Sequence, residues 1–130
     1  ALDTIANAPK GTAGYQDDDF EYSLSLYQGK PLLMRQAGSA STYDSLPKPL
    51  GRTDQGDCAI RKTADGVVYE LALPPVSISP FKLLPGSATR FNFIVNMNDG
   101  QKRIGWIELT PGIGQHPKRP DQFMDMVLLP

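Results

Sequence analysis

The sequence is poor in the residues that build thiol, metal or nucleophilic chemistry. Cys58 is the one cysteine and His116 the one histidine. A lone cysteine cannot form an intrachain disulfide, and a lone histidine supports neither a transition-metal site nor a catalytic triad. We therefore expect His116 on a surface loop, where it could play a minor part by hydrogen bonding to a ligand.

The sequence also lacks an excess of charge of one sign, and it lacks long apolar runs. Thirteen Lys and Arg balance fourteen Asp and Glu, for a net charge of -1. No overall field favours nucleic acid or an acidic membrane surface, so we expect neither as a partner. No apolar run could span a bilayer, and no N-x-S/T acceptor is present. A neutral partner fits this composition better.

Glycine and proline are plentiful, with twelve of each in 130 residues, whereas aromatic residues are few. This balance favours short strands joined by turns over long helices. The length suits one domain over residues 1–130. The composition therefore predicts a single all-β domain with little helix.

Alternating apolar residues and turn signals place the strands. In "FEYSLSLY", Phe20, Tyr22, Leu24 and Leu26 share one face, which is typical of a half-buried strand. Asp65-Gly66 and "MNDGQK" mark two hairpin turns. The predicted strands are 20–27, 30–36, 58–63, 67–73, 90–96, 103–109 and 126–129, with one turn of helix near 121–123. A long loop is expected over 37–57. Two antiparallel sheets packed face to face, a jelly-roll-like β-sandwich, would bury their apolar faces.

Five segments in a fixed order resemble a known family. They are "DDDFEY" (17–22), "VYELALP" (68–74), "RFNFIVNMNDG" (90–100), "KRIGWIELTPGIG" (102–114) and "RPDQFMDMVLL" (119–129). This series is similar to the later two thirds of the family 9 carbohydrate-binding modules. The resemblance implies a β-sandwich appended to secreted polysaccharide-degrading enzymes, with its first strands missing or supplied by another chain.

The resemblance also implies a function and a location. Such modules act without catalysis, holding a polysaccharide or oligosaccharide near a partner enzyme outside the cell or in the periplasm. For this chain we expect the sugar contacts from the following residues: Trp106, Asn96, Asn98, Arg103, Tyr43 and His116. Of these six, we expect the largest contributions from Trp106, Asn96, Asn98 and Arg103.

The acidic run Asp17, Asp18 and Asp19 suggests a structural calcium ion. Calcium takes several carboxylate and carbonyl oxygens from irregular loops, and the family resemblance points the same way. The alternative is an acidic loop whose carboxylates stay in water.

Two interpretations stay open for the amides and the indole. Phe91, Phe93 and Val95 alternate with Asn92 and Asn96, so we expect the amides on the face away from the core. They could bind sugar hydroxyls or tie neighbouring loops to the sheet. Trp106 could stack on a sugar ring, although the sequence favours it slightly as a core residue.

Two other function classes compete with sugar binding. A sandwich without its first strands would expose sheet edges, which pair readily with another polypeptide, so an interaction domain packed on a catalytic domain or partner chain is the main alternative. Glu70 and Glu108 lie in predicted strands and could in principle serve as a glycosidase pair. Nothing in the sequence brings these two carboxylates together, so we expect no enzyme.

Overall fold

The computed structural model describes residues 1–38 and 51–130. Its largest sheet has six strands in the order β10-β7-β1-β2-β3-β4, and two hairpins, β5-β6 and β8-β9, form sheets of their own. Every strand pairing described is antiparallel. The strands are β1 (Leu2–Asp3), β2 (Asp19–Tyr27), β3 (Lys30–Ala37), β4 (Gly51–Arg52), β5 (Asp57–Lys62), β6 (Val67–Ala72), β7 (Ala88–Phe91), β8 (Ile94–Asn98), β9 (Arg103–Glu108) and β10 (Met124–Val127). The all-β, sandwich-like fold predicted from the sequence is confirmed.

Within residues 1–38 and 51–130, helix is limited to two short 3-10 turns, η1 (Pro75–Ile78) and η2 (Pro120–Gln122). Each has proline at its start, where the missing N–H costs nothing. The predicted turn of helix near 121–123 is confirmed. The last strand begins at Met124, two residues earlier than predicted, because η2 ends at Gln122 and the chain extends directly into pairing with β7.

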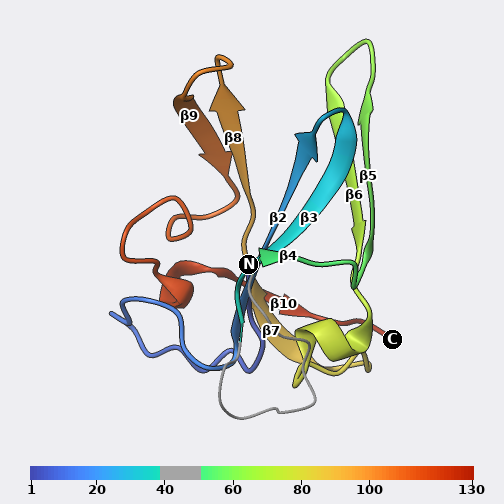
Figure 1. Ribbon diagram of the computed structural model, residues 1–130. Coiled ribbons are helices and arrows are strands. Elements are labelled where there is room, and N and C mark those ends of the chain that lie inside the picture. Colours follow the sequence, from blue (N-terminus) through green and yellow to red (C-terminus); the bar gives the residue numbers. More distant parts are fainter. Residues whose placement is uncertain (39–50) are drawn as a thin grey trace.

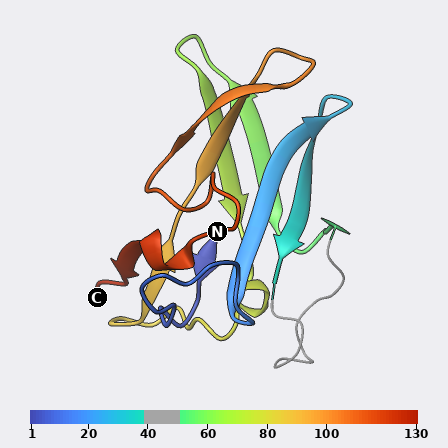
Figure 2. The same ribbon diagram turned by 90° about the vertical axis from the view of Figure 1, so that its left-hand side faces the viewer.

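Three hairpins rise from one base (Figures 1 and 2). They are β2-β3, β5-β6 and β8-β9. The turn of the first uses Gln28 and Gly29, both with positive φ of 51° and 77°, which suits a tight hairpin. In the second, the Thr63 N–H donates to the Gly66 carbonyl at 2.8 Å. That turn therefore lies on residues 64 and 65, one position before the predicted Asp65-Gly66.

The core lies in the base of the molecule. Phe20, at the start of β2, is fully buried, and Leu33 on β3 is 3% exposed. The other buried apolar side chains come from the loops and 3-10 turns of the base: Ala8, Ile78, Phe81, Ile113 and Phe123. The far parts of the hairpins are exposed, so their side chains are available for contacts outside the chain.

Candidate functional site

The β8-β9 hairpin has one polar face and one apolar face. Residues paired across an antiparallel ladder share a face. The pairs Asn96 with Trp106 and Asn98 with Arg103 therefore lie on the same side of the hairpin. A register shift between Met97 and Asn98 makes this possible, since it brings Arg103 onto the face of Trp106 despite their odd spacing. Four residues predicted as sugar contacts thus come together on one face.

The contacts among them form a small aromatic and polar cluster. The Arg103 guanidinium lies over the Trp106 ring, 4.7 Å from its centroid, and its Nη1 donates to Asn96 Oδ1 at 3.3 Å. Trp106 is 44% exposed. The expectation that Trp106 fills the core is therefore wrong, because no second layer covers this part of the hairpin among the described residues. The cluster offers an aromatic surface bordered by amide and guanidinium groups.

Asn98 mainly shapes the hairpin turn. Its Oδ1 accepts a hydrogen bond from the Gly100 N–H at 2.7 Å, and Asp99 Oδ1 accepts from Gln101 and Lys102 N–H groups at 2.9 Å. These backbone bonds lower the pKa of the Asp99 carboxyl. The side-chain amide nitrogen of Asn98 extends from an exposed position, so a contact with a ligand would come from that group.

The loop after β9 contacts the indole. Glu108 Oε2 accepts a hydrogen bond from the Gly114 N–H at 2.8 Å. A Cβ on Gly114 would lie 2.5 Å from Trp106 Nε1, so glycine is needed for this approach. His116 follows two residues later and is exposed, as expected. Glu108 thus holds the loop against Trp106, while Glu70 lies on β6 in a different hairpin.

Asn92 does not share the exposed position predicted for the amides. It is fully buried. Its Nδ2 donates to the carbonyls of Thr110 and Pro111 at 2.8 and 3.3 Å, and its Oδ1 accepts from the Thr110 N–H at 3.2 Å. Its neighbours Phe93 and Val95, predicted for the core, are 43% and 37% exposed. The alternative role, tying a loop to the sheet, is therefore confirmed for Asn92.

Tyr43, the remaining predicted sugar contact, lies in segment 39–50, outside the described residues.

A second candidate site is an acidic cluster in the base. One carboxylate oxygen from each of Asp3, Asp18 and Asp19 lies within 4.8 Å of the others, and all three side chains are buried. Asp3 is on β1, and the other two lie at the entry to β2, its partner strand. Asp17 of the predicted acidic run is exposed and is not in this cluster.

Most oxygens of the cluster have protein donors. Asp3 accepts from the Asn7 and Ala8 N–H groups at 3.2 and 3.3 Å, and Arg90 Nη1 lies 3.4 Å from its Oδ2. Asp18 Oδ2 accepts from the Ile5 N–H at 3.3 Å. One arginine therefore faces three carboxylates, which leaves the cluster with a net negative charge.

Asp19 is the exception, because one of its oxygens is buried without a protein partner. Its Oδ2 accepts from the Gln16 N–H at 2.6 Å, whereas Oδ1 has no hydrogen-bond partner among the described residues. Burial, helped by the charges of Asp3 and Asp18 and opposed by the hydrogen bond from Gln16, raises the pKa of this carboxyl from 3.8 to about 7. A buried carboxylate oxygen without a donor is costly unless a proton or a cation sits beside it.

The cluster has the chemistry that a hard cation requires. Oxygens that bind one calcium ion at about 2.4 Å lie at most about 5 Å apart, and the three carboxylates meet that limit. Asp3, Asp18 and Asp19 would hold the ion, which would supply positive charge to a buried acidic cluster. Sequence reasoning missed Asp3, because only the pairing of β1 with β2 brings residue 3 beside residue 19.

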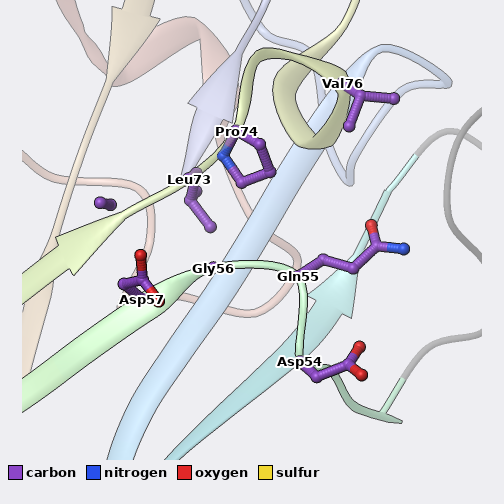
Figure 3. A pocket seen from close by; sticks show the side chains of 8 residues that line it. Asp54, Gln55, Gly56, Asp57, Leu73, Pro74 and Val76 are labelled. Carbon is purple, nitrogen blue, oxygen red and sulfur yellow. The ribbon is translucent and has the colours of Figure 1, made fainter.

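A depression between the β4–β5 connection and the segment after β6 lies apart from both sites. It has a volume of about 570 Å³. Figure 3 shows Asp54 and Gln55 on one strand connection and Pro74 and Val76 on the segment opposite. No aromatic side chain lines it, so it lacks the flat apolar surface on which a sugar ring stacks.

Among residues 1–38 and 51–130, no helix has the length and apolar character needed to cross a membrane. Comparisons with protein-family models, with curated proteins and with solved structures find no match for this chain. The resemblance to family 9 modules therefore stays a prediction.

Proposed function

We propose that the protein is a non-catalytic carbohydrate-binding module that binds a neutral saccharide on the polar face of β8-β9. The observation that carries this proposal is the cluster of Trp106, Arg103 and Asn96 on one exposed face. Aromatic rings bind the apolar face of a sugar, and amide and guanidinium groups at the rim bind its hydroxyls. The ligand would be held near a partner enzyme, outside the cell or in the periplasm.

The acidic cluster supports a role for calcium in this module. We assign the ion a structural role, because the three carboxylates are buried and lie in the base rather than on the β8-β9 face. Calcium there would neutralise the buried carboxylates where β1 pairs with β2.

Titration with xylo- and cello-oligosaccharides tests the sugar site. Trp106 is the one tryptophan, so its fluorescence reports directly on this face. We expect a saturable shift at millimolar sugar. Loss of one hydrogen bond in Asn96→Ala should weaken binding about fivefold to tenfold, and Trp106→Ala should abolish the heat measured by calorimetry.

Ile107→Ala is the matched control, since Ile107 is an exposed side chain on the same strand that pairs with Val95 on the opposite face of the hairpin. It should bind sugar as the parent protein does. No fluorescence shift and no heat at millimolar concentrations of either sugar series would contradict the proposal.

A second candidate function is an interaction domain that packs on another polypeptide. It is favoured by the opposite, apolar face of the same hairpin. There the side chains are more than one third exposed although all are hydrophobic: Phe93, Val95, Met97, Ile107 and Leu109. A contiguous exposed apolar surface of this kind is typical of a protein contact.

A further inference from the structure

The polar face of the β8-β9 hairpin carries opposite charges at its two ends. Along β9 this face presents Arg103 near the hairpin turn, Trp106 in the middle and Glu108 at the far end. Arg103 shares the face because of the register shift between Met97 and Asn98. Glu108 shares it because residues two apart on a strand point to the same side. A ligand lying along Trp106 therefore meets a cation at one end and a carboxylate at the other.

The loop after β9 borders the Glu108 end of this face. Glu108 Oε2 accepts a hydrogen bond from the Gly114 N–H at 2.8 Å. Gly114 lies so close to the indole that a Cβ on it would be 2.5 Å from Trp106 Nε1. At the opposite end Arg103, the first residue of β9, is exposed. Polar groups of a ligand therefore reach the face most freely at the Arg103 end.

Two contacts hold the Arg103 side chain in place. The guanidinium lies 4.7 Å from the centroid of the Trp106 ring, and Nη1 donates to Asn96 Oδ1 at 3.3 Å. A long side chain ordinarily loses rotamer freedom when it binds a ligand, and this loss weakens binding. Because Arg103 is already positioned beside the indole, it loses less of this freedom.

The Nε–Nη2 edge of Arg103 is unused. On an arginine, the Nε–H and one Nη2–H point in the same direction and can donate to both oxygens of one carboxylate. Arg119 shows this geometry in the same chain, because its Nε and Nη2 donate to the two oxygens of Asp121 at 2.9 and 2.8 Å. Within residues 1–38 and 51–130, Arg103 makes no ion pair, and its one hydrogen bond comes from Nη1. The edge suited to a carboxylate therefore has no partner there.

The charges at the hairpin turn also favour an anion. Lys102 and Arg103 are adjacent exposed cations, whereas residues 98–103 contain one carboxylate, that of Asp99. Asp99 Oδ1 already accepts two backbone hydrogen bonds, from the Gln101 and Lys102 N–H groups at 2.9 Å. The turn therefore has a local excess of positive charge, although the net charge of the whole chain is -1.

We propose that Arg103 selects a saccharide whose neutral main chain carries a carboxylate, in the form of a uronic acid branch or neighbouring unit. The neutral ring stacks on Trp106, and the carboxylate oxygens accept hydrogen bonds from Arg103 Nε and Nη2, as those of Asp121 do from Arg119. The assignment rests on the proposed sugar site and narrows the class of its ligand.

Asn98 supplies a further donor at this end of the site. It pairs with Arg103 across the ladder, so the two side chains share the face. Its Oδ1 accepts from the Gly100 N–H at 2.7 Å, which leaves the Nδ2 hydrogens for a ligand. The uronic acid therefore lies toward the hairpin turn, and the neutral chain extends toward Glu108.

Two xylo-oligosaccharides of equal main-chain length test the assignment, one with a glucuronic acid branch and one without. In the parent protein, Trp106 fluorescence and calorimetry should show about fivefold to tenfold tighter binding of the acidic sugar, because a paired charge-assisted hydrogen bond at an exposed site adds this much. In ¹H–¹⁵N NMR spectra the Arg103 Nε–H resonance should shift more with the acidic sugar than with the neutral one. Equal affinities for the two sugars would overturn the assignment.

Arg103→Lys separates the paired hydrogen bonds from charge alone. Lysine keeps the positive charge but lacks the two parallel donors, so this variant should bind both sugars with affinities within about twofold of each other. Lys102→Gln is the matched control, since it removes the adjacent exposed cation, and it should keep the preference for the acidic sugar. If Lys102→Gln lost the preference as fully as Arg103→Lys, general attraction to the turn would replace selection by Arg103.

The neutral sugar distinguishes failure of the assignment from failure of the proposed function. Saturable binding of the neutral sugar without any preference for the acidic one would refute the role of Arg103 and leave the sugar site intact. No fluorescence shift and no heat with either sugar would refute both.

Discussion

At the scale of single residues, chemically equal side chains have opposite roles. Asn92 and Asn96 are four positions apart, the first in the connection between β7 and β8 and the second in β8. Asn92 is fully buried and makes three hydrogen bonds to the loop after β9, whereas Asn96 is exposed and contacts the Arg103 side chain. The difference comes from Asn92 lying opposite Ala1, where the base of the fold closes around it.

Asn92→Ala should destabilise the protein. The substitution leaves the Thr110 N–H and carbonyl without their buried partner and removes the packing of the amide, so we expect the free energy of unfolding to fall by about 2–4 kcal/mol. Urea unfolding measures the change. Asn96→Ala, which removes one exposed contact, should stay within about 0.5 kcal/mol of the parent; equal losses in both variants would refute the distinction.

At the scale of elements, the loop from 109 to 119 depends on one glycine. Gly112 has a φ of +117°, and a Cβ there would lie 2.5 Å from the carbonyl oxygen of Arg119. The Arg119 N–H donates to the Gly112 carbonyl at 3.0 Å and closes the loop. This loop carries Gly114 beside Trp106, so its closure shapes one border of the proposed sugar site.

Gly112→Ala should therefore both destabilise the chain and disturb the sugar site. We expect a loss of about 2 kcal/mol or more, because a strained φ and a backbone clash act together. Gly100→Ala is the control: its φ is +94°, but a Cβ meets no atom within 4 Å, so only the conformational cost of about 1 kcal/mol applies. Differential scanning calorimetry compares the two, and an equal fall in Tm would show that the contact with Arg119 is unimportant.

Sequence patterns predict the hairpins well, because a hairpin depends on alternation and turn residues that lie close together in the chain. The strands at 58–63 and 67–73 were located to within one residue of β5 and β6. The short strand β1 was not predicted, since two residues carry no periodicity. Its pairings with Phe20 and Phe91 also bring Asp3 into the acidic cluster and bury Asn92. Such long-range contacts leave no local signal.

At the scale of the whole molecule, the acidic cluster joins distant parts of the base. Asp3 on β1, Asp18 just before β2, Asp19 at the start of β2 and Arg90 on β7 meet in the largest sheet. The Thr89 hydroxyl also donates to the Asp3 carbonyl at 2.7 Å. The charge state of this cluster therefore affects the pairing of three strands at once.

The raised pKa of Asp19 predicts how stability depends on pH without a divalent cation. Its carboxyl titrates near pH 7 in the folded chain and near 3.8 as an ordinary aspartate, so the folded state keeps the proton longer. The free energy of unfolding should fall as pH rises from about 4 to 7, by a contribution on the order of 4 kcal/mol, and the loss should be complete above pH 7. Urea unfolding in the presence of a chelator, over this pH range, measures the slope.

Calcium and Asp19→Asn should each remove that contribution to the slope, for different reasons. Calcium stabilises the ionised carboxylates and should raise the Tm at pH 7 in proportion to the logarithm of its concentration, whereas an amide at position 19 does not titrate in this range. Asp65→Asn, a change in the exposed β5-β6 turn, is the control and should keep both the slope and the calcium response. If calcium raised the Tm of Asp19→Asn as much as that of the parent, its binding site would lie elsewhere, because the unpartnered Asp19 Oδ1 is the oxygen that distinguishes this cluster from a set of satisfied carboxylates.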